Sequence, residues 1–490
     1  VLPQPNEAVT ITVEADDPDE ISTMVLWWSA SGGSWQSVPM ILNAEGQYQG
    51  DVPGQSSGAV IQVYVEGHDG LGATSTFPAG GRDSRALIKV DDGQQAATPV
   101  DTLRLILTNS DDSKMFASTN MLSNDHLGAT VIHNDEVFYD VGVRFKGSQS
   151  GRTIPARVAS YRVRFHPDHL FRGVHERISL DRNGVSDISG NNSKDELLIK
   201  QMFNHAGGGP ISLYDDIAYM IPPRRQYTGT VILQLARYDE IWMEETFPNG
   251  QDGQLFELEL VYFQTLGTHD KTPDGLKISG GTADWGDVED RGNDKNRYRP
   301  RLQIKNHREQ DDFSSMVELS QAFSLNGTAL DQALDGLMDV DQWMRAYAME
   351  TVAGIFDGAL DHAFHNVYWY QRPDNGLIVA LPWDMDSLLQ IPTNAPLWTN
   401  HWSIGKVIDR PQNARLFYGH AHDIINTTAN VNYMAHWTSH YGALAGQNFA
   451  GQLNYIRNRS NYITSRWSTL APSVPFAASS SNPLNVGAQS

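Results

Sequence analysis

The residues best suited to chemistry lie in one segment of this chain, IFDGALDHAFHNVYWYQRPDNGLIVALPWDMDSLL, which covers positions 355–389. It contains Asp361 and Asn366, five residues apart, and then Asp384 and Asp386, two residues apart. Carboxylate and amide oxygens are the ligands that a hard cation such as Mg²⁺ takes in proteins. The residue types therefore point to a divalent-metal site, provided that the fold brings the two pairs together.

The element that would bring them together is a β-hairpin. The runs 367–370 and 377–381 are rich in aromatic and β-branched residues and predict two strands. The Asn-Gly pair between them is a strong signal for a tight hairpin turn. Because the two ends of a hairpin lie side by side, the two acidic pairs are expected to meet. Carboxylates at hairpin ends also cap turns, and that interpretation stays open.

The spacing within the segment gives a second indication. Asp-x-x-x-x-Asn is the separation in the protein-kinase catalytic loop, where the aspartate accepts a proton from the attacking hydroxyl and the asparagine binds metal. The pattern alone occurs by chance in many chains, and it gains weight from the Trp-Asp-x-Asp sequence at the end of the hairpin. His362 and His365 have no matching third ligand pattern and are interpreted as ordinary loop histidines.

Charge and composition narrow the class of protein. The 490 residues include 36 basic and 58 acidic side chains, which gives a net charge of −22 with neutral histidines. Such a charge repels nucleic acids and anionic membranes, so neither is expected as a partner. The absence of cysteine excludes disulfides, thiolate zinc sites and cysteine nucleophiles. No apolar run is long enough to span a bilayer.

Residues 1–92 are predicted to form a small all-β domain. Strand patterns at 9–13, 24–28 and 61–65 are separated by Gly, Ser and Pro turns, without a helical run. This arrangement is typical of an immunoglobulin-like β-sandwich. The acidic stretch 15–20 has carboxylates that could bind calcium, but it lacks the glycine and spacing of an EF-hand loop. A solvated acidic turn is therefore the favoured interpretation.

Residues 100–472 are predicted to form a second domain, of the α+β class. Its strands are expected at 103–107 and 141–145, and further helices over 410–468. A capping box, Ser193 with Glu196, begins one helix, and a second runs from about 340 to 356 with Asp339 or Asp341 as its cap.

Two further segments are assigned by composition. The Gly- and Asp-rich stretch 247–300 is expected to be a long insertion or lid. Residues 473–490, rich in Ser, Ala, Asn and Pro, are expected to be a linker or tail, after which a further module is possible.

One stretch departs from the overall acidity. Residues 144–164 contain six basic side chains and no acidic one. Strand alternation places Arg162 and Arg164 on one face and the apolar residues between them on the other. Guanidinium groups are well shaped for phosphate oxygens, but two arginines on a solvated strand face explain the pattern equally well. Both interpretations stay open on the residues alone.

The hairpin segment resembles the CotH family of spore coat protein H-type kinases. That family's pattern is Asp, then Asn-x-Tyr-x-Tyr, then Pro-Trp-Asp-x-Asp, and the matching residues here are Asp361, Asn366, Tyr368, Tyr370, Pro382, Trp383, Asp384 and Asp386. Looser similarity at 140–148, 160–165 and 302–305 extends the resemblance to about residues 100–470.

The resemblance implies an atypical protein-kinase-like domain preceded by the small sandwich. It implies use of ATP and Mg²⁺ (or Mn²⁺) to phosphorylate serine or threonine of extracellular or coat proteins, and a secreted or cell-surface location. By position, Asp361 matches the catalytic residue, and Asn366, Asp384 and Asp386 match the metal site. The residues that match the nucleotide side are Gly147, Ser148, Arg152, Arg162, Arg164 and Lys305.

Departures from the family pattern support an alternative. The basic strand has Val158, Ala159, Arg162 and Arg164 where the family carries lysines, and Leu235 stands at the position of a family glutamate. A non-catalytic surface or matrix protein on a kinase-like scaffold is therefore the second hypothesis. It predicts no stabilisation by ATP and metal. Carbohydrate binding or hydrolysis ranks last, because no carboxylate pair can be placed at the separation that chemistry requires.

Overall fold

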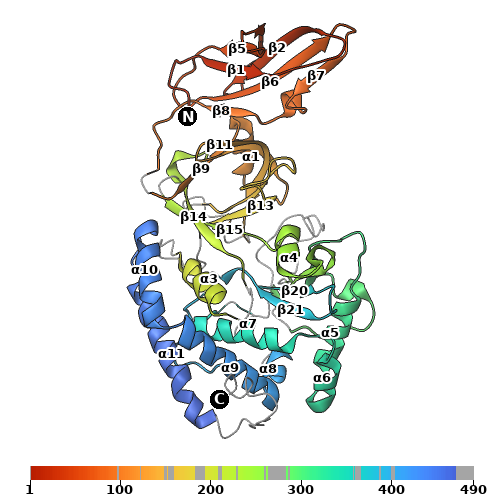
Figure 1. Ribbon diagram of the computed structural model, residues 1–490, viewed down its shortest axis with the longest axis vertical. Helices are drawn as coiled ribbons and strands as arrows, with labels where there is room; N and C mark the ends of the chain where they lie inside the picture. Colours follow the sequence, from red (N-terminus) through yellow and green to blue (C-terminus); the bar gives the residue numbers. More distant parts are fainter. Residues whose placement is uncertain are drawn as a thin grey trace. The chain divides into compact units, whose positions relative to one another are not determined.

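The computed structural model describes residues 2–96, 99–121, 123–147, 152, 159–182, 194–207, 212–227, 230–258, 261–262, 283–284, 287–356, 358, 366–385, 388–398 and 403–470 (Figure 1). The described residues form two compact units. The first contains those of 1–182 and 217–234, and the second those of 183–216 and from 235 onwards. Helices and sheets are both present, which confirms the α+β class. No helix among the described residues is long and apolar enough to cross a membrane.

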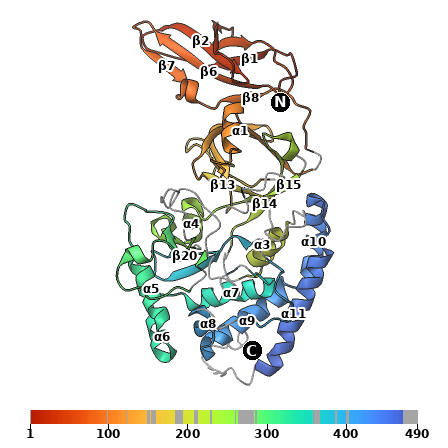
Figure 2. The ribbon, with the colours of Figure 1, turned by 180° about the vertical axis from the view of Figure 1, so that it is seen from behind.

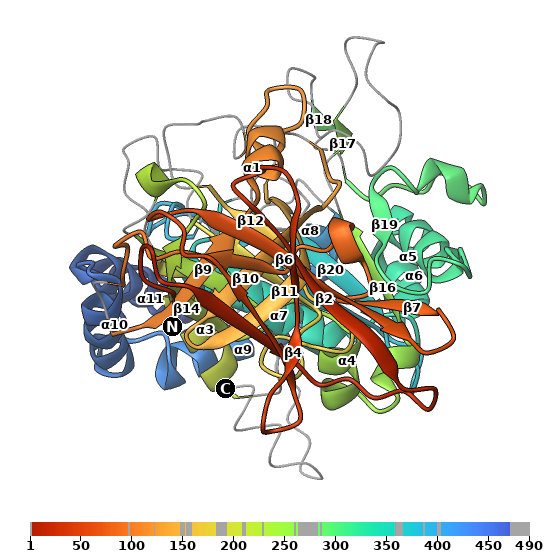
Figure 3. The ribbon, with the colours of Figure 1, turned by 90° about the horizontal axis from the view of Figure 1, so that it is seen from above.

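The N-terminal part of the first unit consists of two antiparallel sheets that share one core. One sheet has the order β1-β5-β4, and the other has β3-β2-β6-β7 with β8 also paired to β6. Their bounds are β1 Val9–Val13, β2 Ile21–Ala30, β3 Gln36–Pro39, β4 Ile41–Leu42, β5 Tyr48–Val52, β6 Val60–Asp69, β7 Thr74–Phe77 and β8 Leu87–Lys89. The long strands β2 and β6 run side by side (Figure 3). Leu26, Ile61 and Val52 lie in the shared core, and the three strands predicted here are confirmed as β1, β2 and β6.

The rest of the first unit is a closed barrel. Its strand order is β10-β11-β12-β13-β15-β14-β9, and the parallel pairing of β14 with β9 belongs to the closed ring. Their bounds are β9 Asp101–Ile106, β10 Leu127–His133, β11 Glu136–Phe145, β12 Tyr161–Arg164, β13 Arg177–Asp181, β14 Asp215–Ile221 and β15 Thr230–Leu235, with helix α1 at Asn109–Met115. Leu103, Val131, Val143 and Val163 belong to its apolar core. Closure leaves no free edge among these strands.

The two-sheet part and the barrel are joined by specific contacts within the first unit. Leu87 N–H donates to Thr130 Oγ1 over 3.0 Å, and Arg85 Nε donates to Asp111 Oδ2 over 2.7 Å. A small apolar cluster of Val60, Leu87 and Ile106 fills the space beside them. Paired polar groups around a dry centre are what a specific interface requires.

The second unit is organised around a four-stranded sheet of order β19-β16-β20-β21. Their bounds are β16 Gln254–Leu258, β19 Leu302–Ile304, β20 Val367–Gln371 and β21 Ile378–Pro382, and a separate small pair is formed by β17 Val261–Tyr262 and β18 Ala283–Asp284. The predicted hairpin is confirmed as β20 and β21, with Val367 opposite Pro382. The expectation of a lid over 247–300 is wrong for β16, because this strand lies inside the sheet between β19 and β20.

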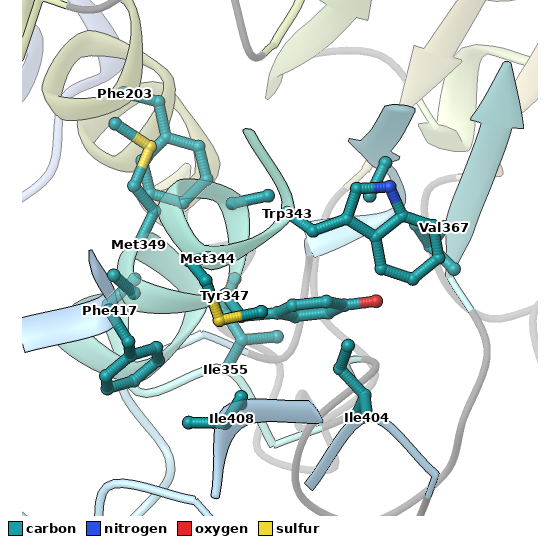
Figure 4. Close-up of a cluster of buried hydrophobic side chains, with 14 of the residues drawn as sticks. Phe203, Trp343, Met344, Tyr347, Met349, Ile355, Val367, Ile404, Ile408 and Phe417 are labelled. Atoms are coloured by element: carbon teal, nitrogen blue, oxygen red, sulfur yellow. The ribbon is translucent and has the colours of Figure 1, made fainter. Parts of the chain in front are cut away.

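Helices surround this sheet, and α7 is the most buried of those described. Their bounds are α3 Asp195–His205, α4 Glu240–Thr246, α5 Ser314–Ser324, α6 Gly327–Leu334, α7 Val340–Ala353, α8 Ser403–Ile408, α9 Pro411–Thr427, α10 Val431–Ala445 and α11 Ala450–Leu470. Helix α7 lies along the sheet (Figure 2), and all of its residues from Trp343 to Ala353 are buried. Tyr347 points toward Ile404 of α8 in the core (Figure 4). A helix buried on all sides belongs at the centre of a large core.

Different interactions determine where helix α7 begins and where it ends. At the start, the Asp339 side chain accepts a hydrogen bond from Gln342 N–H over 3.1 Å, as the predicted cap requires. At the end, Gly354 has φ +65°, and a Cβ there would collide with Tyr455 Oη. Only glycine satisfies both demands. The helix therefore ends at Ala353 and not near 356 as predicted.

A buried arginine secures the same end of α7. Arg459 of α11 is 1% exposed, and its guanidinium donates to Thr351 O over 3.0 Å and to Ala395 O over 2.7 Å. The last carbonyls of a helix lack partners within the helix and carry partial negative charge. Arg459 therefore fixes both the C-terminal turn of α7 and the loop at 393–396.

We expect Arg459→Ala to lower the free energy of unfolding of the second unit by about 3 kcal/mol, because buried carbonyls lose a charged donor. Urea unfolding followed by tryptophan fluorescence measures this change. The matched control is Arg457→Ala on the exposed side of the same helix, which should change stability by less than about 0.5 kcal/mol. Equal losses in the two variants would contradict the assigned role.

Candidate functional site

The open end of the hairpin brings Asn366 and Asp384 side by side, as the sequence predicts. Trp383 N–H donates to Asn366 O over 2.9 Å, one step beyond the last strand pair. Both residues are half-buried and left-handed, with φ of +58° for Asn366 and +51° for Asp384. Asn and Asp are the side chains that tolerate this conformation best, and such residues cluster at functional sites. Asp361 and Asp386 lie outside the described residues.

Helix α7 holds the hairpin in place through the backbone of β21. The Gln342 side-chain amide donates to Ala380 O over 2.6 Å and accepts from Ala380 N–H over 2.9 Å. Trp343 Nε1 donates to Ile378 O over 2.8 Å. In the described sheet β21 is an edge strand, and its outer backbone groups at Ile378 pair with Leu337 O and Asp339 N–H just before α7. The Gln342 amide pairs with the next outward-facing residue, Ala380, where no neighbouring strand of the sheet is present.

A polar chain crosses the sheet on the face away from α7. Tyr368 Oη donates to Glu257 Oε1 over 3.0 Å, and Glu257 forms an ion pair with Lys305. The Glu257 and Lys305 side chains are 16% and 19% exposed. A charge pair that is largely removed from water is screened little by salt and holds the lysine in one orientation. The sheet therefore presents one ordered ammonium group in the unit that carries Asn366 and Asp384.

A buried polar cluster lies behind the hairpin. Lys200 Nζ is 3.7 Å from Glu196 Oε1 and 3.4 Å from Asp215 Oδ1, and all three side chains are at most 3% exposed. Burial raises the pKa of Tyr238, and the two carboxylates raise it further, so the phenol stays protonated. It donates to Pro382 O over 2.8 Å. The cluster is thus connected to the residue that precedes Trp383 and Asp384.

Glu196 belongs to the predicted capping box, which stays a prediction. Its carboxylate lies in the buried ion pair with Lys200, and α3 begins at Asp195 with no side-chain cap from Lys194. The other member of the predicted capping box, Ser193, lies outside the described residues.

The predicted nucleotide-side residues of the first unit fall into two groups, and Arg152 belongs to the more buried one. Its guanidinium donates to Gly147 O over 2.7 Å and to Ser123 O over 3.0 Å, and it is 5% exposed. Burial, with a smaller contribution from Arg162, lowers the pKa of Arg152 to about 10. Arg152 therefore shapes the turn at Gly147, which has φ +98°. Ser148 lies outside the described residues.

The second group lies on the outer face of the barrel. Tyr161 and Val163 belong to the barrel core, so Arg162 and Arg164 point the other way, as the predicted alternation requires. Across the strands, Arg162 stands opposite Arg144, and Arg164 stands opposite Arg177. Like charges directly opposite each other destabilise a sheet. Arg164 and Arg177 share Glu176 at 3.1 and 3.3 Å, which offsets part of this repulsion.

His126 lies beside this arginine face. A Cβ added to Gly142 would be only 3.0 Å from His126 Cβ, so the imidazole packs directly over the strand. Partial desolvation, followed by the charges of Arg144, Arg162, Arg164 and Arg177, lowers the pKa of His126 to about 4. The histidine therefore stays neutral at ordinary pH and adds no further charge.

The structure thus brings the predicted residues together in separate groups. Asn366, Asp384 and Lys305 belong to one sheet region of the second unit, whereas the remaining described ones belong to the first unit. Sequence reasoning missed Glu257, Tyr238 and the buried cluster. The alternation Phe-Glu-Leu-Glu-Leu at 256–260 was the available signal for Glu257, and it was hidden by the Gly- and Asp-rich stretch around it.

The donor set of the hairpin fits a hard divalent cation. Asn366 offers an amide oxygen and Asp384 a carboxylate, which are oxygen ligands of the kind that Mg²⁺ accepts. Softer metals prefer sulfur or imidazole, and the chain has no cysteine. The arrangement suits chemistry in which negative charge on a phosphate-bearing substrate is neutralised.

Comparison with known proteins identifies one family. The family described as CotH kinase protein matches residues 251–462, a range that includes Glu257, Lys305, Asn366 and Asp384. The resemblance found in the sequence is therefore confirmed over these residues. No curated protein matches the chain.

Among solved structures, the chain is similar to a cycloalternan-degrading enzyme from Trueperella pyogenes, with 11% identity and a TM-score of 0.16 over 37% of this chain and 25% of that one. The same enzyme in complex with isomaltose gives 14% identity and a TM-score of 0.15 over 37% and 24%. The chain spans about a quarter of that enzyme's length. At these TM-scores the likeness supports no statement about fold or substrate.

The depressed pKa of His126 predicts a pH effect on the first unit. In the unfolded chain the imidazole takes up its proton near pH 6.5, and in the folded unit only near pH 4. Protons therefore favour the unfolded state, and stability should fall as pH drops from about 6.5 to 4. The lowered pKa values of Asp92 and Asp101 act below this window. Calorimetry should show a smaller loss of Tm between pH 7 and 4.5 in His126→Gln than in wild type.

The matched control for this pH effect is His436→Gln on α10 of the second unit, at an exposed histidine. It should leave the pH dependence of the first unit unchanged. If His126→Gln loses as much Tm as wild type on acidification, the assigned pKa shift is wrong.

Proposed function

We propose that this protein is a metal-dependent kinase, because the family described as CotH kinase protein matches residues 251–462. In this proposal it transfers the γ-phosphate of ATP to a serine or threonine hydroxyl of extracellular or coat proteins. In the same proposal the protein is located outside the cell or at the cell surface. It has a kinase-like fold that is preceded by an immunoglobulin-like sandwich. The observation that carries the proposal is the left-handed pair Asn366 and Asp384 at the hairpin end, within the matched range.

Asn366 and Asp384, together with Asp386, are assigned to hold the divalent ion, Mg²⁺ or Mn²⁺. Once bound, such an ion neutralises charge on the β- and γ-phosphates and polarises the group that is transferred. Both residues have a left-handed backbone, and they occupy neighbouring positions at the open end of the hairpin. The ties from α7 to β21 keep that geometry fixed before substrate arrives, which is how a preorganised site lowers a barrier.

Asp361 is assigned as the residue that receives the acceptor's proton. In the proposed step the hydroxyl oxygen forms a bond to the γ-phosphorus, and the bond from that phosphorus to the β–γ bridging oxygen breaks. The hydroxyl proton passes to the Asp361 carboxylate, and ADP leaves. The sequence separation of Asp361 from Asn366 matches the spacing that this chemistry uses in protein kinases.

Lys305 is assigned as the cation for the phosphates, and Glu257 as its positioning residue. The family glutamate is replaced by Leu235 in this chain. The ion pair between Glu257 and Lys305 gives the chain a second way to order a lysine in the same sheet as the hairpin. The family resemblance also assigns nucleotide contacts to Gly147, Ser148, Arg152, Arg162 and Arg164, and these assignments stay predictions.

A non-catalytic scaffold is the second candidate, and it is favoured because two basic side chains, Arg152 and Lys146, bind groups of the protein itself. Arg152 is occupied with backbone carbonyls, and Lys146 forms a buried ion pair with Asp181. Groups engaged in this way are costly to redirect toward a phosphate. The two candidates differ in whether ATP and metal bind at all.

Asp384→Asn is expected to reduce phosphate transfer about a hundredfold or more, because it removes a charge that holds the metal while Asn keeps the left-handed backbone. Transfer from labelled ATP to generic Ser/Thr acceptors, and to the protein itself, with Mg²⁺ or Mn²⁺ measures the effect. Asp374→Asn, at the turn end of the same hairpin, is the matched control and should retain activity.

A thermal melt separates this outcome from the scaffold hypothesis. The wild-type protein should gain Tm with Mg-ATP and Asp384→Asn should gain less, because a ligand stabilises only a protein that binds it. Absence of both transfer and a nucleotide-linked shift in the wild type would favour the scaffold.

Lys305→Met is expected to reduce transfer about a hundredfold, because it removes the ammonium group while keeping an apolar stem. Glu257→Gln should raise KM for Mg-ATP about tenfold with a smaller change in kcat, because the lysine is present but less well held. Lys295→Met, which breaks an exposed pair with Asp311, is the matched control and should change neither constant. If Lys305→Met lowers Tm but leaves KM and kcat intact, the lysine is structural.

A further inference from the structure

The two-sheet part of the first unit is open along one side. Strand β1 is the edge of one sheet, and β7 is an edge of the other. Val65 and Phe77 are opposite partners on neighbouring strands, so they share a face, and Val65 is only 4% exposed in the core. Phe77 on the same face is 58% exposed. The core-facing side of β7 therefore lacks the covering that the neighbouring strand has.

A groove of about 780 Å³ occupies this open side. Val13, Ile21, Met24 and Val65 give it an apolar floor, and the exposed residues of β7 form one wall. The opposite wall is the end of β1, whose outer backbone edge pairs with no strand in the described part of the chain. An apolar floor beside a free strand edge is the geometry that accepts an added β-strand.

The rim of the groove is strongly acidic. Glu14, Asp16, Asp17 and Asp69 line it, and the described lining residues include no lysine or arginine. The carboxylates of Asp17 and Asp69 also lie with that of Asp19 within 4.8 Å of one another. Grouped like charges repel each other and favour a cationic partner.

We infer that this groove binds an extended segment of a partner protein that is rich in lysine or arginine and adds a strand to the free edge of β1. Alternate side chains of the segment then face the apolar floor, and its cationic side chains meet the rim at Glu14, Asp16 and Asp17. Main-chain hydrogen bonds supply affinity, while the floor and the rim supply selectivity. The inference concerns binding alone and does not depend on the proposed kinase activity.

A metal ion is a poorer occupant of the whole groove. Carboxylates at one end could be satisfied by a cation, but an ion makes no use of the apolar floor or the strand edge. A peptide strand uses all three features. Binding is therefore expected to persist in the presence of a chelator, and loss of probe binding in EDTA would overturn the inference.

The test is fluorescence anisotropy with the full chain, in EDTA and without nucleotide. The probe is a fluorescein-labelled peptide of alternating lysine and valine, and two comparison peptides replace every lysine by glutamate or every valine by proline. We expect saturable binding of the probe only, because glutamate repels the rim and proline cannot pair with a strand. Equal binding of the proline peptide would reduce the interaction to non-specific charge and overturn the added strand.

Two pairs of variants locate the binding. Ser75→Phe fills the groove from the exposed β7, and Ser37→Phe makes the same change on the exposed edge strand β3 as its control. Glu14→Gln with Asp16→Asn removes two rim charges, and Glu45→Gln with Asp125→Asn removes two exposed charges elsewhere. We expect Ser75→Phe to abolish binding and the rim variant to raise Kd about tenfold at low salt. The controls should bind as wild type does.

Two outcomes would assign the groove differently. If the rim and groove variants bind the probe as tightly as wild type does, the peptide binds elsewhere and the inference fails. If sedimentation shows a dimer that Ser75→Phe converts to a monomer, the occupant is a second copy of the chain and not a basic partner. Calorimetric melts of each variant confirm that the first unit is folded in every comparison.

Discussion

The site of the second unit depends on the clamp between Gln342 and Ala380. Strand β21 is an edge strand, and an edge strand is free to slip or to pair with other chains unless its outer backbone groups are satisfied. The Gln342 amide satisfies one donor and one acceptor at once, and Gln342 stands one turn from the capped start of α7. The bonds of Ile378 with Leu337 O, Asp339 N–H and Trp343 Nε1 hold the same strand. Because the register of the hairpin determines which residues reach its open end, these contacts together favour the placement of Asn366 beside Asp384.

The far end of α7 limits where the chain can go next. Helix α7 ends at Ala353, and Tyr455 leaves no room for a side chain at the following Gly354. Arg459 holds the last turn of the helix. The chain must then pass from Gly354 to Asn366 at the base of β20, and Asp361 lies in that interval of the sequence. Both boundaries are thus fixed by buried contacts. A rigid frame on either side of a functional segment is the usual way in which folds combine stability with chemistry.

Local patterns predicted the fold where the causes are local. The Asn-Gly turn and its flanking strands, the Asp339 cap and the alternation around Arg162 are all confirmed, since each depends on neighbours in sequence. The end of α7 was missed because it depends on Tyr455, far along the chain. Glu196 forms a buried ion pair with Lys200, which also pairs with Asp215 on another element, and local patterns could not predict these partners. The roles of Asp361, Asp386 and Ser148 stay predictions, because these residues lie outside the described part.

The charges of the chain are also distributed unevenly over its surface, which the net charge does not show. The surplus of 22 negative charges coexists with an arginine face on the barrel. Burial, followed by the charges of Arg144, Arg162, Arg164 and Arg177, lowers the pKa of His126 and keeps it neutral beside this face. The same unit carries an acidic groove without a basic side chain among its described lining residues. Screening weakens interactions between exposed charges that lie more than roughly 10 Å apart at moderate salt, so each patch acts mainly on groups close to it. A partner therefore meets a local sign of charge rather than the average, and anionic and cationic partners can be recognised by one chain without conflict.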